Sequence, residues 1–131
     1  MWRAAAVGSA ETEAGRGADG AAPLWPDPGD PRLWWKREDL NRTGSFKDRG
    51  AAVLAAVATA AGAERLVLDS SGSAALAGAA AAARTGLPLT VHAPESLPRA
   101  KRDALAVMGA RVVAEGDRTA AARRGCGGGG P

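Results

Sequence analysis

Residues 32–114 show one repeated pattern, in which a short run of bulky apolar residues is followed by a longer run rich in alanine. Short apolar runs are typical of buried strands, and alanine-rich runs are typical of helices. The pattern predicts strands over residues 33–36, 66–68, 89–92 and 111–113, and helices over residues 45–61, 74–84 and 98–108. Strands and helices that alternate in this way form βαβ units with right-handed crossovers. The predicted fold class is therefore α/β, with a partial parallel sheet covered by helices.

The segments on either side of this pattern differ from it. Residues 1–31 are rich in Ala, Gly, Asp and Pro without a sustained period, and we expect a flexible lead-in there. Residues 32–114 form the predicted α/β domain. The pattern stops after Val113 and the chain ends in GCGGGGP, so residues 115–131 are expected to be a disordered Gly-rich tail without a regular element.

Composition limits the size of the core and the class of protein. The 131 residues include 33 Ala and 18 Gly, against 20 Val, Leu and Phe together. Each buried alanine contributes little hydrophobic free energy, so the core is expected to be thin. The net charge of +3 is too small to indicate nucleic-acid binding. No stretch approaches the roughly 18 apolar residues of a membrane span, so a membrane protein is not expected.

The cysteine content excludes two kinds of site. Cys126 is the only cysteine, so neither an internal disulfide framework nor a multi-cysteine metal site is possible. The first 15 residues contain no bulky apolar segment of signal-peptide length. Together these features predict a cytoplasmic protein without a metal site.

Polar residues are densest just before the first long helix, in KREDLNRTGSFKDRG, residues 36–50. Ser45 and Asp48 have capping-box spacing, so Ser45 is the predicted N-cap and Lys47 falls in the first helical turn. The positive end of the helix dipole disfavours a protonated amine there. A neutral amine is what a Schiff base with a carbonyl cofactor requires. The local pattern alone favours an ordinary surface lysine that is screened by Asp48.

A second polar segment, DSSGSAALAG, spans residues 69–78. A Ser/Gly loop that leads into a helix directs backbone N–H groups at whatever lies above it, and such an arrangement favours an anion. Taken alone, such a loop more often serves only to cap its helix.

The first segment resembles the cofactor-lysine segment of the fold-type II pyridoxal-phosphate enzymes, which include threonine synthase, the serine/threonine dehydratases and the cysteine synthases. The matching residues, Asn41, residues 43–47 and Arg49, are most similar to the threonine synthase version. The resemblance implies that Lys47 forms a Schiff base with pyridoxal 5'-phosphate and then moves protons at the substrate carbons. One departure is Arg42, where the family usually has proline.

The second segment is similar to the Ser-Ser-Gly-Asn-Ala-Ala loop of the same family, which holds the substrate α-carboxylate. Here Ser73 replaces the asparagine that reaches the cofactor's phenolic oxygen, and its single hydroxyl is shorter than an amide. The resemblance implies cofactor-binding roles for Lys47, Phe46 and Ser73, and substrate-binding roles for Ser70, Ser71, Gly72, Ala74 and Thr43.

The resemblance covers roughly residues 23–114 and ends in a Gly-Ala-x-Val-Val strand at residues 109–113. It implies an N-terminal part of a threonine synthase-like lyase, acting on a small amino-acid substrate. The reaction would be β,γ-replacement on a phosphohomoserine-type substrate or β-elimination on serine or threonine. Complete members of the family are implied to be homodimers.

Whole members of the family are more than twice this length, and their second part supplies a glycine-rich loop for the cofactor phosphate. Gly127–Gly130 is similar to that loop in letters, but no strand or helix is predicted beside it. We therefore expect a truncated chain. The alternative is a non-catalytic remnant or interaction module that keeps the α/β fold. A nucleotide-binding domain is not supported, because the chain has neither G-x-G-x-x-G after a strand nor a P-loop.

Three further residue types are expected to be structural or incidental. His92 is the only histidine and has no evident partner in the sequence, so a structural role is expected. Cys126 lies among glycines and is expected to be an incidental thiol. Trp34 and Trp35 are expected to supply the core and edge packing that alanines do not provide.

Overall fold

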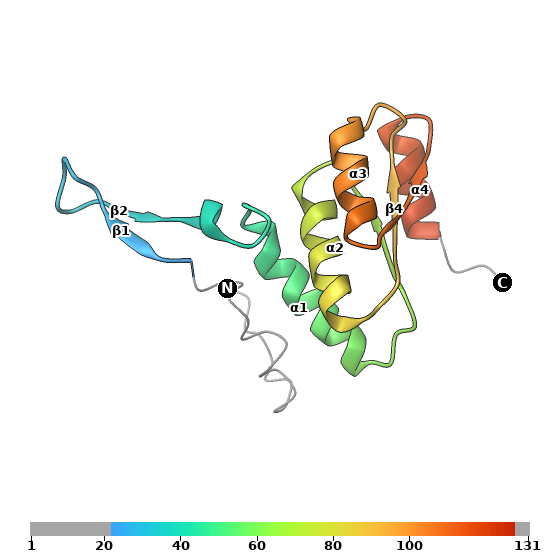
Figure 1. Ribbon diagram of the computed structural model, residues 1–131, viewed down its shortest axis with the longest axis horizontal. Coiled ribbons are helices and arrows are strands. Elements are labelled where there is room, and N and C mark those ends of the chain that lie inside the picture. The colour runs from blue at the N-terminus through green and yellow to red at the C-terminus, as the bar shows by residue number, and fades with distance from the viewer. Residues whose placement is uncertain (1–21, 128–131) are drawn as a thin grey trace.

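The computed structural model describes residues 22–127, which form an α/β body and a two-stranded arm that projects from it (Figure 1). The arm contains β1 and β2, and the body contains three strands and four helices. The bounds of the arm strands are Leu24–Pro26 (β1) and Trp34–Lys36 (β2), and a short 3₁₀ helix, Glu38–Leu40, follows. The bounds of the body elements are Lys47–Ala60 (α1), Leu66–Asp69 (β3), Ser73–Thr85 (α2), Leu89–Ala93 (β4), Arg99–Val107 (α3), Arg111–Ala114 (β5) and Arg118–Gly127 (α4).

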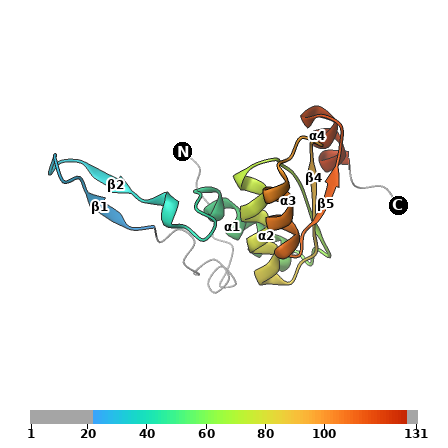
Figure 2. The same ribbon diagram turned by 45° about the horizontal axis from the view of Figure 1, so that its top comes forward.

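The body is built on a parallel sheet with the strand order β3-β4-β5. Helices α2 and α3 pack on one face of the sheet, with α1 alongside α2, and α4 packs against β4 and β3 on the other face (Figure 2). The predicted α/β class with a parallel sheet is therefore confirmed. Because parallel strands end at the same edge, the loops after β3, β4 and β5 also lie at one edge of the sheet.

The core lies between β4 and the helices that cover it. Along β4 the buried residues alternate with half-buried ones, and Leu89, Val91 and Ala93 face the core. Most of the other core side chains are alanines, which allow close packing of helix on strand. Gly78 shows how close this packing is, because a Cβ added there would lie 2.3 Å from Cδ1 of Leu68.

The first predicted strand does not join this sheet. β2 instead pairs antiparallel with β1, a strand that lies inside the segment expected to be a flexible lead-in. The turn between them is ordered by Asp27, whose Oδ1 accepts hydrogen bonds from the N–H groups of Gly29 (2.8 Å) and Asp30 (3.0 Å). The expectation that Trp34 and Trp35 pack in the core is wrong, because their exposed fractions are 56% and 51%.

The expectation of no regular element after Val113 is also wrong. β5 continues to Ala114, and α4 begins at Arg118. Asp117 caps this helix, because its Oδ1 accepts the N–H of Ala120 at 2.8 Å, and Ala121 is buried against the sheet. Alanine is the strongest helix former, and packing on the sheet adds to that preference. Cys126 therefore falls in a helix and not in a loose tail, while residues 1–21 and 128–131 lie outside the described residues.

Two kinds of feature are absent from residues 22–127. None of the helices within residues 22–127 has the length and apolar character needed to cross a membrane. In the same range, no three His, Cys, Asp or Glu side chains gather as a metal site would require. The division of the chain at residues 31 and 114 stays a prediction.

Candidate functional site

Lys47 is the first residue of α1, so the predicted place of this lysine in the first helical turn agrees with the structure. The cap differs from the prediction in one respect. Phe46, not Ser45, occupies the N-cap position, and its backbone is already helical. The hydroxyl of Ser45 still accepts the N–H of Lys47 at 3.2 Å, so it satisfies one of the free N–H groups at the helix start.

Asp48 does not complete the predicted capping box. Its buried carboxylate turns back to the preceding loop, where Oδ2 accepts the N–H of Thr43 at 2.7 Å and Oδ1 accepts the Thr43 hydroxyl at 2.6 Å. A buried carboxylate needs such donors, and two of them fix its orientation. The pair Thr43–Asp48 therefore clamps the loop that presents Lys47.

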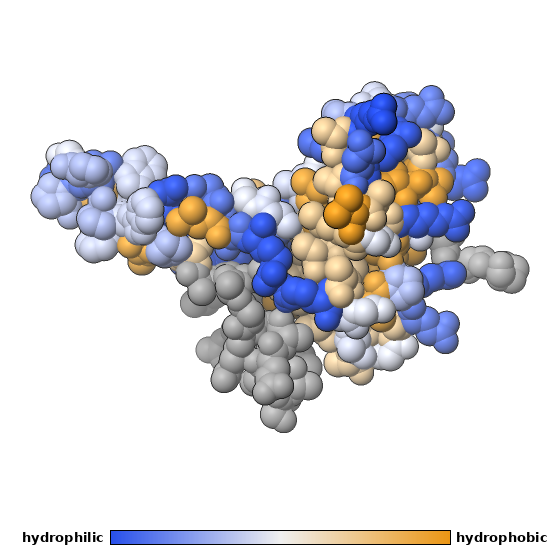
Figure 3. Space-filling view, viewed as in Figure 1, coloured by the Kyte–Doolittle hydropathy of each residue, from blue (hydrophilic) through white to orange (hydrophobic). Residues whose placement is uncertain are grey.

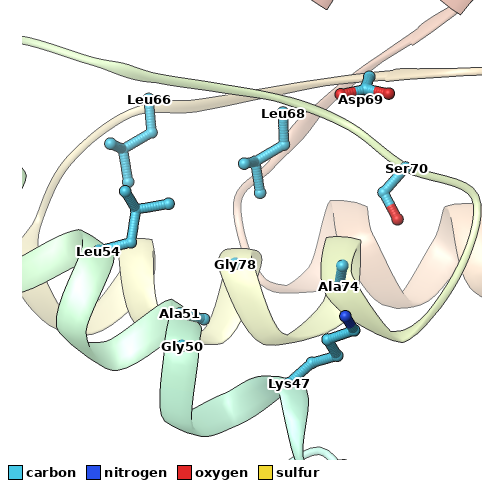
Figure 4. Close-up of a pocket in the computed structure, with 10 residues that line it drawn as sticks. All are labelled: Lys47, Gly50, Ala51, Leu54, Leu66, Leu68, Asp69, Ser70, Ala74 and Gly78. Carbon is cyan, nitrogen blue, oxygen red and sulfur yellow. The ribbon is translucent and has the colours of Figure 1, made fainter. Parts of the chain in front are cut away.

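The side chain of Lys47 reaches into a cavity of about 170 Å³ between α1, β3 and α2 (Figure 4). Its amine points toward Ala74 on α2, with Ser70 nearby at the end of β3. The ring of Phe46 lies beside the same amine, with its centroid 4.9 Å from Nζ, and is itself exposed to solvent. The cavity is lined by Lys47, Gly50, Ala51, Leu54, Leu66, Leu68, Asp69, Ser70, Ala74 and Gly78.

The cavity has a polar end and an apolar end. Lys47 and Ser70 lie at the polar end, while Leu54, Leu66 and Leu68 form the apolar end (Figure 4). The arrangement can therefore present the amine of Lys47 to an aromatic aldehyde, for whose ring the leucines offer an apolar surface.

The loop between β3 and α2 borders the polar end of the cavity. The N–H of Ser70 donates to the carbonyl of His92 at 3.1 Å, which ties the start of the loop to β4. The N–H of Gly72 donates to the Ser70 hydroxyl at 3.2 Å. Nζ of Lys101, on α3, donates to the carbonyl of Ser71 at 3.5 Å. The loop is thus held by a bond to β4, by a bond between two of its own residues, and by a bond from α3.

The structure brings only some of the predicted site residues together at the cavity. Lys47, Ser70 and Ala74 line it, and Ser71 and Gly72 belong to the loop that borders it. Ser73 is the exposed first residue of α2 and is not part of the lining. Thr43 is held by Asp48 and likewise does not line the cavity.

Sequence reasoning missed most of the apolar lining, although a signal was present. Lys47, Gly50, Ala51 and Leu54 follow the spacing i, i+3, i+4, i+7, which is one face of a helix. Leu66 and Leu68 alternate along a strand and therefore point to the same side. The helical spacing that starts at Lys47 and the strand alternation of Leu66 and Leu68 therefore identify the two sides of the cavity.

His92 has a partner that the sequence did not reveal. Its Nδ1 lies 3.3 Å from Oε1 of Glu115, which follows β5, and both side chains are largely buried. The pair joins β4 to the segment after β5, so it agrees with the expected structural role of this histidine.

The residues at the cavity fit the lysine-attached part of the cofactor that the resemblance implies. An amine, a serine hydroxyl and an apolar wall provide attachment, a polar contact and a surface for a ring. The volume of about 170 Å³ is below the roughly 300–1,000 Å³ of a typical small-molecule site. This cavity can therefore enclose part of such a ligand.

Comparisons with known proteins agree with this geometry. A family model described as "Pyridoxal-phosphate dependent enzyme" matches residues 17–126. The chain is 36% identical over 104 residues to threonine synthase from Synechocystis sp., a match that covers 73% of this chain and 27% of that protein. It is 38% identical over 101 residues to threonine synthase from Halalkalibacterium halodurans, covering 72% of this chain and 28% of that protein.

Solved structures give the same result at the level of the fold. The structure of the processed form of threonine deaminase isoform 2 from Solanum lycopersicum matches with a TM-score of 0.70 and 28% identity, covering 79% of this chain and 31% of that one. Serine racemase from Dictyostelium discoideum matches with the same TM-score and identity, covering 79% and 36% of the two chains. The chain thus spans about a quarter of the length of the matched threonine synthases and about a third of these solved chains.

Proposed function

Because this chain belongs to the family of pyridoxal-phosphate dependent enzymes, we propose that it is the lysine-bearing part of an amino-acid lyase similar to threonine synthase. The observation that carries the proposal is the position of Lys47, whose amine enters a cavity opposite Ser70 and Ala74. The cofactor of the family is pyridoxal 5'-phosphate, and when bound it supplies an electrophilic aldehyde and an electron-withdrawing ring.

The proposed roles divide between the two sides of the cavity. Lys47 would hold the cofactor through its Nζ, and its amine would take up and return a proton at the substrate carbon. Phe46 and Ser73 are proposed to lie on the cofactor side. The leucines at the apolar end exclude water from the ring.

The substrate side consists of the loop after β3 and its neighbours. In the proposal the loop binds the α-carboxylate of an amino acid through backbone N–H groups at the start of α2. Its members are Ser70, Ser71, Gly72 and Ala74, and Thr43 lies on the neighbouring loop.

The proposed reaction is β,γ-replacement on a phosphohomoserine-type substrate. The identities of 36% and 38% to two threonine synthases support it over the related β-elimination on serine or threonine, since the solved threonine deaminase matches at 28%. A homodimeric assembly and a cytoplasmic location stay predictions from the sequence.

The test is to add pyridoxal phosphate to the purified chain, reduce with borohydride, and locate the pyridoxyl group by peptide mapping. The chain has three lysines, Lys36, Lys47 and Lys101, so the distribution of the pyridoxyl group among them is simple to measure. We expect the label on Lys47, and we expect Lys47→Arg to abolish it. Lys36→Arg is the matched control, because Lys36 donates to the carbonyl of Ala22 in the arm, away from the cavity. Equal labelling of all three lysines would contradict the proposal.

A second candidate function is a cofactor-binding or interaction module without catalysis. Ser73, where the family has asparagine, favours it, because this exposed residue does not line the cavity. The two candidates differ in their response to substrate. A lyase loaded with pyridoxal phosphate should convert O-phospho-L-homoserine with release of inorganic phosphate, whereas a non-catalytic module should release none.

A further inference from the structure

Lys101 contacts the proposed substrate loop from a helix that sequence reasoning did not connect with the site. It lies in the first turn of α3, and its Nζ is 3.5 Å from the carbonyl oxygen of Ser71. α3 packs against α2, so the lysine extends from one helix to the loop that begins the other.

This contact acts on one particular peptide plane. In a trans peptide the C=O and the following N–H point in opposite directions, and the described residues contain no cis peptide. The carbonyl of Ser71 faces Lys101, so the N–H of Gly72 faces away from it. That N–H donates to the hydroxyl of Ser70, a residue that lines the cavity. The N–H of this peptide is therefore directed at the cavity side of the loop.

The neighbouring peptides are held by other bonds. The N–H of Ser70 donates to the carbonyl of His92, and the carbonyl of Gly72 accepts the N–H of Ala75 at 3.1 Å. The Ser71–Gly72 peptide is thus held on one side by Lys101 and on the other by the hydroxyl of Ser70. Without Lys101, this peptide could rotate and present its carbonyl oxygen to the cavity, where it would repel a carboxylate.

We infer that Lys101 is a positioning residue that keeps the carbonyl of the Ser71–Gly72 peptide turned away from the substrate carboxylate, so that the N–H of this peptide holds the Ser70 hydroxyl at the cavity. The inference rests on the proposed function for the role of the carboxylate. It extends that function by adding a residue of α3 that acts through the loop and does not touch the substrate.

The first experiment measures amide hydrogen exchange of the peptide that covers residues 70–75. Lys101→Met keeps the apolar stem and removes the charge, and we expect roughly three- to tenfold faster exchange in this segment without a change in Tm. Lys101→Arg should restore slow exchange. The matched control is Arg99→Met on the same helix turn, because Arg99 is exposed and forms an ion pair with Asp103 on its own helix. Exchange in Lys101→Met equal to that of the original chain would overturn the inference.

The second experiment measures the concentration of L-serine that halves borohydride labelling of Lys47. We expect Lys101→Met to raise it roughly tenfold and Arg99→Met to leave it unchanged. An unchanged L-serine concentration in Lys101→Met would overturn the inference even if the loop exchanges faster. The two proposals can fail separately. If Lys47 is labelled but the loop of Lys101→Met exchanges as slowly as that of the original chain, only the role of Lys101 is disproved. If the label is scattered over the lysines of the original chain, the proposed function is disproved.

Discussion

The body and the arm of this molecule differ in the size and the burial of their apolar side chains. The body packs small side chains, and its central residues Val91 and Ala93 are completely buried. The arm carries the larger side chains, including Trp25, Trp34 and Trp35, and leaves about half of each exposed. In Figure 3, hydrophobic residues gather over the helices of the body, while the surface of the arm is mainly polar or neutral with separate hydrophobic patches.

This comparison shows that the close approach of helices to the sheet, more than the size of the side chains, decides where a core forms in this chain. Helix α2 lies close to β3 because Gly78 has no side chain, and alanines fill the remaining space. Among residues 22–127, no helix or further sheet packs extensively on the strands of the arm. It is held by local contacts, such as the indole N–H of Trp35 on Oδ2 of Asp27 at 2.7 Å and the guanidinium of Arg37 over the ring of Trp25 at 4.3 Å.

The largest expected effect comes from removing one of the few large side chains in the body. Leu105 is 1% exposed in a core made mainly of alanine. Leu105→Ala should lower the free energy of unfolding by about 2–5 kcal/mol, because it removes apolar contacts and leaves a cavity. Denaturant unfolding followed by circular dichroism measures this change.

The matched variant in the arm is Trp34→Ala, which removes a larger side chain. Because Trp34 is 56% exposed, we expect a change below about 1 kcal/mol. If Trp34→Ala destabilises the chain as much as Leu105→Ala does, the contrast between body and arm is wrong.

An intermediate effect is expected at Asp48, in the first turn of α1, whose carboxylate holds the loop that joins the two regions. Asp48→Ala leaves the N–H and hydroxyl of Thr43 without their acceptor and should cost about 1–3 kcal/mol. It should also loosen the loop before Lys47, which amide hydrogen exchange of residues 41–47 would detect. Thr43→Val removes only the hydroxyl donor and should cost less. Equal stability of Asp48→Ala and the original chain would show that the clamp contributes nothing.

The smallest expected effect is a pH response confined to the arm. Hydrogen bonds from the Trp35 indole, and then from the N–H groups of Gly29 and Asp30, lower the pKa of Asp27 below its ordinary 3.8. A lowered pKa means that the carboxylate stabilises the arm above pH 3.8, and that this contribution is lost as the pH falls through the folded value. The NMR signal of the Trp35 indole N–H should therefore shift only below pH 3.8.

Two variants check that assignment. Asp27→Asn should abolish the pH response of the Trp35 signal, because the amide does not titrate. Asp30→Asn should retain it, because the pKa of Asp30 is lowered chiefly by Arg32 and not by the indole. A response that persists in Asp27→Asn would assign the titration to another group.

Much of the body was predictable because its signals are local. Alanine runs, the terminators at Gly86 and Gly109 and the apolar runs of β3, β4 and β5 each act within one element. The first-turn position of Lys47 followed from the same kind of signal. α4 was missed because its sequence contains glycines, and its burial against the sheet is not a local property.

By itself, the sequence determined the α/β order, the lysine at the start of a helix and the Ser/Gly loop after a strand, because each depends on neighbours in the chain. Only the tertiary structure decided that β2 pairs with β1, that Asp48 holds Thr43 and that Lys101 reaches Ser71. In the sequence, several other residues are equally suitable partners for each of these interactions. The choice among them depends on which groups the packed helices and strands bring within hydrogen-bond distance.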